Sequence, residues 1–420
     1  MAISVTSRRF LSVLLTTGAL CLVAAQSAAQ TAPTTPPQPE PAGIIAEPRF
    51  FLRGIDFVGR TAGDGSDRKN GYRLLTSTEL PGAGWISGGG GFRRWFGRDA
   101  AMLDATGAVS WRLYKAAGLR LEIPSINRGL LSAEINARWQ DLTQVTYFGD
   151  GPNAPLENRS EYRLTYQDVT GVATLHPMSS ISMTAAAGWM RPTVKRPAGT
   201  FLRGNPAVQD AFPEDPTVLR GTQPDFFHTE LSFTADTRDF RSHAARGGFY
   251  YVGLISYVDQ DGGRFSTDRV EAEALHFVPL HERLILALHG SFAAADTGAD
   301  RTVPLYLMPS LGRTFLRGYS EHRFHDREAL VLNVETRFAL LTHVDAVMFY
   351  DAGSVAPRTR ALDLGLRSYG VGFSMHSRRA TFARVDIAHG ADGWLFGFRM
   401  SDPFHMTRVA RRTGLVPFSR

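Results

Sequence analysis

From Phe50 to Phe404 the chain is a series of segments, each about ten residues long, in which apolar and polar residues alternate. Gly, Asp, Asn and Pro separate these segments. The last segment is the clearest, because Trp394, Phe396 and Phe398 occupy every second position and fall on one face of a strand. A period of two over many short segments is typical of β-strands with two different faces, so the pattern predicts an all-β protein.

The two faces of a predicted strand near residues 330–340 differ sharply. Leu332 and Val334 share one face, and Asn333, Glu335 and Arg337 share the other. In a soluble sandwich the apolar face would meet a protein core, whereas in a membrane barrel it meets lipid and the polar face lines the interior. Aromatic residues crowd the predicted strand ends, as they do at membrane interfaces. No helix-period segment is long enough to cover the strands, and we therefore favour a transmembrane antiparallel β-barrel.

The alternating segments number about sixteen, which is within the usual range for such a barrel. The connections vary in length as periplasmic turns and extracellular loops do. The tight ones are Pro279–Arg283, Leu341–His343 and Ser377–Arg379, and the long ones are Met190–Asp225 and Asp300–Arg327. We expect strands to begin near Trp85, Ala105, Gly118, Leu130, Thr143, Tyr162, Ser180, Phe226, Gly248, Ser266, Leu284, Ala329, Val344, Arg367, Ala380 and Trp394.

The N-terminal residues predict a cleaved signal peptide over residues 1–29. Arg8 and Arg9 form its positive region, Phe10–Ala25 its apolar core, and Ser27–Ala29 supply the small residues needed for cleavage. A Pro-rich linker over residues 30–48, a barrel over residues 49–404 and a basic tail over residues 405–420 follow. Export of a barrel predicts the outer membrane of a Gram-negative cell.

Composition excludes several other classes of protein. The net charge is a modest +6, and the chain has no concentrated stripe of basic residues with aromatic residues among them. We therefore expect no nucleic-acid partner. The single cysteine, Cys21, lies in the predicted signal peptide, which leaves the mature chain without a thiol for a disulfide or a metal. The alternative, that Cys21 is a lipidation site, is disfavoured because the preceding residue, Leu20, is bulky where a lipoprotein signal needs a small residue. No later apolar run approaches the roughly 18–20 residues of a transmembrane helix.

The segment 312–355 carries the most specific pattern. Arg317, Gly318 and Tyr319 lie in a long loop, and Glu335 and Asp351 project to the polar face of the two strands that follow. A carboxylate inside a barrel needs a partner, and a guanidinium binds it in a planar, bidentate way. Spacing alone favours the plainer interpretation, in which an exposed loop arginine and two unrelated acids have nothing to do with one another.

An RGY-type loop, a strand with Glu-x-Arg-Phe, and Phe-x-Asp-x-Gly ending at Gly353 follow in this order, which resembles the BamA/TamA-like surface antigen superfamily. The resemblance implies an extracellular loop that folds into the barrel and an Arg317 that pairs with Glu335 and Asp351. It also implies that this loop joins strands eleven and twelve. The well-known members carry POTRA domains before the barrel, so this chain resembles a barrel-only member.

Two further motifs are similar to the same family. Asp236, Arg238 and Asp239, with Gly247 downstream, resemble its periplasmic turn between strands eight and nine. The last strand resembles the signal that is read by the outer-membrane assembly machinery, with Phe396, Phe398 and Phe404 as its aromatic residues.

The resemblance implies a role in outer-membrane biogenesis or in protein or lipid translocation through a laterally gated barrel. We expect the gate to be a seam between the strand with Gly88–Gly91, weakened by its glycines, and the terminal strand at Trp394–Phe404. The expected partners are outer-membrane lipid and lipopolysaccharide, the assembly machinery and periplasmic proteins. A passive pore or a structural barrel is the alternative.

The chain lacks the patterns of a hydrolase. It has neither a Gly-x-Ser-x-Gly elbow nor a His-Glu-x-x-His pair, and its histidines are scattered. The densest group is Glu321, His322, His325 and Asp326, which we interpret as polar loop chemistry in preference to a metal site or a base. We expect no enzymatic activity, no cofactor and no metal.

Overall fold

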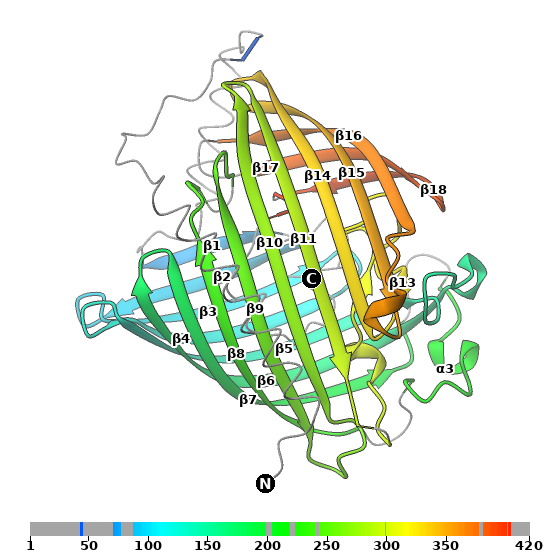
Figure 1. Cartoon of the computed structure of the whole chain (residues 1–420). Helices are drawn as coiled ribbons and strands as arrows, with labels where there is room; N and C mark the ends of the chain where they lie inside the picture. Colours follow the sequence, from blue (N-terminus) through cyan, green and yellow to red (C-terminus); the bar gives the residue numbers. More distant parts are fainter. Residues whose placement is uncertain are drawn as a thin grey trace.

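The computed structural model describes residues 43–44, 70–76, 87–198, 204–218, 223–240, 243–298, 300–377, 381–400 and 402–404. The predicted signal peptide, most of the predicted linker and the basic tail lie outside these residues. The described chain is an antiparallel β-barrel whose sheet has sixteen strands (Figure 1). Within these residues, no helix is both long and apolar enough to cross a membrane.

Each strand of the sheet pairs with its neighbours in the chain, except that β11 pairs with β14 across a long connection. That connection contains a two-stranded sheet of β12 (Ser310–Leu311) and β13 (Phe324–His325), and the short helix η3 (Leu305–Leu307). The other short helices are η2 (Leu156–Asn158), α3 (Val208–Ala211) and η4 (Thr359–Ala361). The sheet strands are β1 (Gly71–Thr76), β2 (Ser87–Phe96), β3 (Ala101–Ser110), β4 (Lys115–Ile126), β5 (Leu131–Tyr147), β6 (Ser160–Met178), β7 (Ile181–Lys195), β8 (Phe226–Asp236), β9 (Gly247–Asp259), β10 (Thr267–His281), β11 (Leu284–Asp296), β14 (Glu328–Leu341), β15 (Val344–Ala356), β16 (Leu366–His376), β17 (Thr381–Gly390) and β18 (Gly393–Arg399).

The predicted strand count is confirmed, but two of the predicted strands are wrong. The predicted strands at Leu130 and Thr143 are one strand, β5. A bulge in the β5–β6 ladder between Leu142 and Val145 shifts the alternation by one residue, which made one strand look like two. The strand missed by the pattern is β1, which pairs with β2 and precedes the predicted first strand. It has six residues, too few for the alternation to stand out.

The two ends of the barrel differ in their connections, as predicted. The β10–β11, β14–β15 and β16–β17 turns are tight, and they lie at one end together with the β8–β9 connection. We call this the short-turn end. The long β7–β8 and β11–β14 connections lie at the opposite end, which we call the long-loop end.

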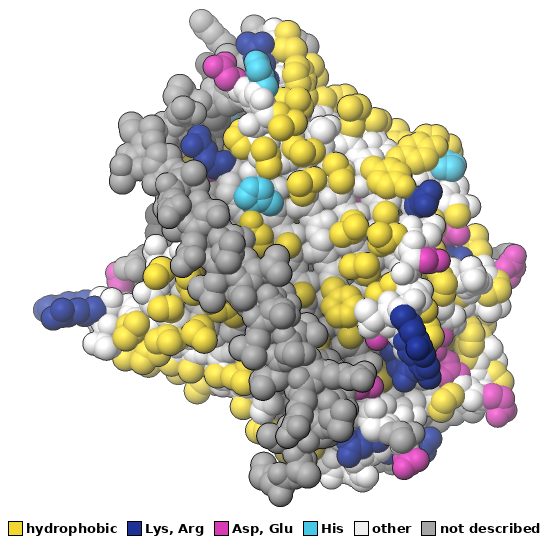
Figure 2. All heavy atoms as spheres, in the orientation of Figure 1, with side chains coloured by type: hydrophobic (Ala, Val, Ile, Leu, Met, Phe, Trp, Pro, Cys, Tyr) yellow, Lys and Arg dark blue, Asp and Glu magenta, His cyan; other side chains and the backbone are white. Residues whose placement is uncertain are grey.

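The outer face of the barrel is apolar and the inner face is polar. Apolar side chains spread over the outward surface (Figure 2). On β14, Leu332 and Val334 point outward with 43% of their surface exposed, whereas Asn333, Glu335 and Arg337 are almost fully buried inside. The predicted faces of this strand are therefore confirmed, and the large apolar residues lie where lipid would contact them.

The outward orientation of β14 predicts how it responds to a charge. Val334→Arg lies near the middle of the strand, and we expect it to lower the free energy of unfolding by about 2–4 kcal/mol, because it carries a cation into the hydrocarbon. The matched control, Leu330→Arg, lies near the strand end and is expected to cost about 0–1 kcal/mol. Urea unfolding from lipid vesicles measures both. Equal effects at the two positions would contradict the membrane orientation.

Candidate functional site

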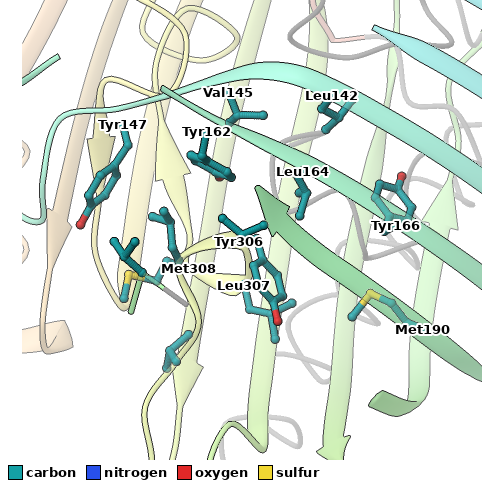
Figure 3. Close-up of a cluster of buried hydrophobic side chains, with 14 of the residues drawn as sticks. Leu142, Val145, Tyr147, Tyr162, Leu164, Tyr166, Met190, Tyr306, Leu307 and Met308 are labelled. Carbon is teal, nitrogen blue, oxygen red and sulfur yellow. The ribbon is translucent and has the colours of Figure 1, made fainter. Parts of the chain in front are cut away.

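Two parts of the β11–β14 connection pack against inward-facing residues of different strands. Its first half, at η3, packs into an apolar cluster rich in tyrosine, beside Tyr162 and Leu164 of β6 (Figure 3). Two hydrogen bonds hold it there: Leu305 N–H donates to the Thr217 carbonyl at 3.1 Å, and Arg269 Nη1 donates to the Leu307 carbonyl at 3.3 Å. The second half, residues 311–319, packs against the inner faces of β14 and β15 in a cluster that includes Leu316, Tyr319 and Val331.

Arg317 forms a bidentate pair with Asp351 of β15. Arg317 Nε donates to Asp351 Oδ2 at 3.0 Å, and Nη2 donates to Oδ1 at 2.6 Å. The Arg317 backbone N–H also donates to Oδ2, at 3.1 Å. Asn333 and Ser368 donate to the same carboxylate, at 2.8 Å and 3.0 Å. The guanidinium lies 3.5 Å from the centre of the Phe349 ring. Asp351 therefore binds the guanidinium in its plane, and the Phe349 ring contacts one of its faces.

Glu335 of β14 accepts hydrogen bonds from three arginines. Arg317 Nη1 donates to Oε2, and Arg337 Nε donates to Oε1 at 2.9 Å. Arg384 of β17 donates through both terminal nitrogens, each at 2.9 Å. Glu335 has no exposed surface, and each of the three arginine side chains is at most 3% exposed. We call this group, with Asp351, the arginine network.

The charges of the arginine network nearly balance. Arg384 also binds Asp386, and Arg337 also binds Asp402. Three guanidinium groups thus meet four carboxylates, since Glu335 and Asp351 complete the set. Burying any one of these charges alone would cost several kcal/mol, so the members are stable inside only as a set.

The small and aromatic residues of the loop motif position Arg317. Gly318 lies so close to the β17–β18 turn that a Cβ would come within 2.6 Å of the Gly390 nitrogen. Tyr319 is buried, and its hydroxyl donates to the Arg367 carbonyl at 3.1 Å. A Cβ on Gly353 would lie 3.1 Å from Leu316, so this position also favours glycine. The structure therefore brings all six predicted residues of the loop motif into one contact region.

The predicted turn motif lies at the short-turn end, between β8 and β9. Arg238 pairs with Asp236 through Nε at 2.9 Å and through Nη2 at 3.0 Å. Asp239 Oδ1 accepts backbone N–H groups from Phe240 and Ala245, which closes the turn. Gly247 has a φ of +86°, and a Cβ there would lie 2.7 Å from the Thr237 carbonyl carbon. These contacts are local to the turn.

The terminal strand is shorter than predicted. β18 ends at Arg399, so Phe396 and Phe398 lie on it and Phe404 does not. Phe396 faces outward, with 53% of its surface exposed. Phe404 instead turns inside, next to Phe249 and Phe277, because Asp402 binds Arg337 of the arginine network and accepts the Phe404 N–H at 2.8 Å.

The glycine-rich strand is not the first strand of the sheet. β2 lies between β1 and β3, with Gly90 opposite Leu74 on one side and Gly107 on the other. The expected seam at Gly88–Gly91 is therefore wrong, and the first edge of the sheet is β1. Gly89 has a further packing role, since a Cβ there would lie 2.7 Å from the Ala108 side chain.

Several residues that hold the connection in place were not singled out from the sequence. Arg323 pairs with Asp392 in the β17–β18 turn at 2.8 Å. Arg313 donates to the Phe396 carbonyl, and Arg399 Nη2 donates to the Arg313 carbonyl at 2.8 Å. Arg399 lies at a polar-face position of its strand, so the alternation along the sequence could have identified it as an inward-facing residue. Nothing local in the sequence distinguishes Arg313 or Arg323 from exposed loop arginines.

The Glu321 group does not converge on one point. The Thr314 hydroxyl donates to Glu321 at 3.0 Å, and the His322 ring lies 3.3 Å from the Ser310 hydroxyl. Burial raises the pKa of Glu321 and lowers the pKa of His322 to about 3, so the imidazole is neutral at physiological pH. Both hydrogen bonds join residues within the β11–β14 connection.

Neutralising Glu335 tests how far the network depends on it. We expect Glu335→Gln to lower the free energy of unfolding by about 3–5 kcal/mol, because three buried guanidinium groups lose their shared carboxylate. Asp210→Asn, which breaks an ion pair with Arg196 on the exposed surface, is the control and should cost less than about 1 kcal/mol. Urea unfolding from vesicles gives both values. A cost below 1 kcal/mol for Glu335→Gln would mean that the network does not stabilise the fold.

Comparison with known proteins agrees with this architecture. A family model described as the Omp85 superfamily domain matches residues 111–385. The chain is similar to the structure of BamA from Haemophilus ducreyi lacking POTRA domains 1–3, with a TM-score of 0.58 and 12% identity over 83% of this chain and 77% of that one. It is also similar to CdiB from Escherichia coli, with a TM-score of 0.50 and 12% identity over 80% of this chain and 61% of that one. No curated protein sequence matches the chain.

At 12% identity the two solved structures show the fold alone. The family model rests on the sequence, and its match spans well over half of the chain. The expected resemblance is confirmed: this protein belongs to the Omp85 superfamily.

Proposed function

We propose that the protein acts in outer-membrane biogenesis or in translocation of protein or lipid, through a barrel that the β11–β14 connection closes and that opens sideways. The observation that carries the proposal is the buried pairing of Arg317 with Glu335 and Asp351. It fixes a long connection inside the barrel, where it would obstruct a passive pore.

Contacts on two separate walls support closure of the lumen by this connection. Its first half packs with the β5, β6 and β7 wall near Tyr306, and its second half is bound to β14 and β15 through Arg317. A connection anchored at both places spans the interior. We propose that this arrangement is the resting state.

The short edge strands support a lateral gate. β1 has six residues and β18 has seven, whereas β6 has nineteen. No ladder joins β1 to β18 among the residues that the structure describes. Because the stability of a strand pair grows with the length of its ladder, a contact between these two strands would be the easiest one to open. We therefore place the proposed seam at β1 and β18.

The same connection is bound to the proposed gate. Arg323 pairs with Asp392, and Gly318 packs on Gly390, so the β17–β18 hairpin is held at its turn. Arg313 binds the Phe396 carbonyl on β18 itself. Moving β18 would break these contacts, so we propose that release of the connection and opening of the seam occur together.

The proposed partners follow from the same surfaces. Outer-membrane lipid and lipopolysaccharide would contact the apolar outer face, which includes Met348 and Val371. The assembly machinery would read the terminal strand at Phe396 and Phe398. Periplasmic proteins would meet the short-turn end, where the Asp236–Asp239 turn lies.

Planar-bilayer conductance tests closure of the lumen. We expect wild-type protein to conduct little, and Arg317→Ala to give large, noisy openings, because the connection loses its two carboxylate partners. Arg196→Ala is the matched control, since it removes an exposed arginine at the long-loop end and should stay quiet. Steady conductance in wild type, unchanged by Arg317→Ala, would reject closure and favour the alternative of a passive pore.

Disulfide trapping tests the gate. In a Cys21→Ala background, one cysteine is placed on β1 and one on β18. We expect at least one pair to form a disulfide in native membranes. Because a locked seam would stop the proposed role in outer-membrane biogenesis, we expect the outer membrane of these cells to admit a large dye until a reductant is added. The control pair, Leu74→Cys with Gly90→Cys, joins strands that are already paired and should have no effect. Disulfides between β1 and β18 that form fully without consequence would contradict gating, and their complete absence would contradict the position of the seam. The positions for the panel are Tyr72, Leu74 and Thr76 on β1, and Trp394, Phe396 and Phe398 on β18.

A further inference from the structure

Two histidines and an aspartate converge inside the short-turn end, close to Arg337 of the arginine network. His243 comes from the β8–β9 connection, Asp345 from the start of β15 and His376 from the end of β16. Their side chains are 9%, 6% and 8% exposed. One nitrogen or oxygen from each residue lies within 4.8 Å of the others. We call these three residues the short-turn histidine site.

The histidine–aspartate distances at this site exceed the usual length of a hydrogen bond. His376 Nε2 lies 3.4 Å from Asp345 Oδ1, and His243 Nε2 lies 3.8 Å from Asp345 Oδ2. An N–H···O hydrogen bond has a donor–acceptor distance of about 2.7–3.2 Å. Asp345 Oδ2 is buried and accepts no hydrogen bond from any residue within the described ranges. A buried carboxylate oxygen in that position is costly unless a cation binds it.

The opposite nitrogen of each imidazole already has a partner. His376 Nδ1 lies 3.2 Å from the Ser377 carbonyl, which can only accept, so the proton is on Nδ1. His243 Nδ1 lies 3.2 Å from the Thr381 hydroxyl, which is able to accept a hydrogen bond from Nδ1, and we infer the same tautomer for His243. Both rings then present the Nε2 lone pair toward Asp345. A histidine that binds a metal through one ring nitrogen usually donates a hydrogen bond from its other nitrogen.

The stacking of the two rings argues against a simple ion pair. The His243 and His376 ring centres lie 3.8 Å apart with 13° between the planes. Two protonated imidazoles at this distance would repel each other, so they cannot both be charged partners of Asp345. A divalent cation among the three lone pairs would attract all of them at once.

We propose that His243, Asp345 and His376 bind one divalent transition-metal ion, with Zn²⁺ as the best fit to two imidazoles and a carboxylate. A tetrahedral Zn²⁺ with bonds of about 2.0–2.1 Å has ligand atoms about 3.3–3.4 Å apart. The two separations, 3.4 Å to Asp345 Oδ1 and 3.8 Å to Oδ2, are close to this spacing, and binding of the ion would turn the two stacked rings apart so that both Nε2 lone pairs point at it. Water would take the fourth position.

The ion would bind the β8–β9 connection to β15 and β16. His243 is 138 residues from its contact Thr381, and β9 is separated from β15 by three strands of the sheet. Ala244, beside His243, packs in the cluster that also holds Phe404. A metal here would hold the predicted turn motif and the chain after β18 across the same mouth of the barrel.

Zinc titration of the purified full chain, folded in detergent, tests the site. The protein carries no histidine tag and is first dialysed against a chelator. We expect calorimetry to give one Zn²⁺ per chain and the melting temperature to rise with Zn²⁺. His376→Ala and Asp345→Asn should each weaken Zn²⁺ binding at least about 100-fold. Thr381→Val removes only the hydroxyl beside His243 Nδ1 and should weaken Zn²⁺ binding about 10- to 100-fold.

His281→Ala is the matched control, because it removes an exposed histidine at the same end of the barrel and should leave Zn²⁺ affinity unchanged. If the ligand variants fail to fold, Co²⁺ added to wild type gives the same answer through the visible absorption of a four-coordinate ion. Absence of stoichiometric Zn²⁺ and Co²⁺ uptake by wild type would overturn the proposal. So would binding that survives Asp345→Asn and Thr381→Val but is lost in His281→Ala.

Discussion

A buried glutamate determines how the inside of this barrel is organised. Glu335 accepts hydrogen bonds from Arg317, Arg337 and Arg384, and has no exposed surface. One of these arginines comes from the β11–β14 connection, one from β14 itself and one from β17. A carboxylate in this position has to be compensated, and the compensation joins three parts of the chain that are distant in sequence.

The rest of the interior follows from that requirement. Arg317 brings its connection to Asp351, and Gly318 then lies against the β17–β18 turn. Arg337 brings in Asp402, which turns Phe404 inside. Both ends of the barrel are thus connected to the same set of charges. This is why a single arginine substitution is a sensitive test of closure, and why the network is a reasonable place for release to begin.

The short-turn histidine site obeys the same rule with different chemistry. Here the buried carboxylate is Asp345, and it has two imidazoles nearby where Glu335 has guanidinium groups. Guanidinium groups carry their own charge into the interior, whereas neutral imidazoles do not, and this difference favours the proposed external cation beside Asp345, where Arg337 is a nearby fixed positive charge. A protein with such a pair of sites would hold its lumen with internal ion pairs and its short-turn mouth with a metal.

The sequence by itself determined the fold class and the two faces of the strands, because a period of two is a local property that each segment displays alone. The predicted number of strands agrees because one strand was divided in two and another was missed. The sequence also indicated Arg317, Glu335 and Asp351, through the order of motifs shared with a family. Only the tertiary structure decided the rest. The bulge in β5 made one strand look like two, and the six-residue β1 showed no pattern. Arg384, Arg313 and the approach of His243 to Asp345 and His376 depend on which segments become neighbours in the folded barrel, and no local periodicity records contacts between residues so far apart in the chain.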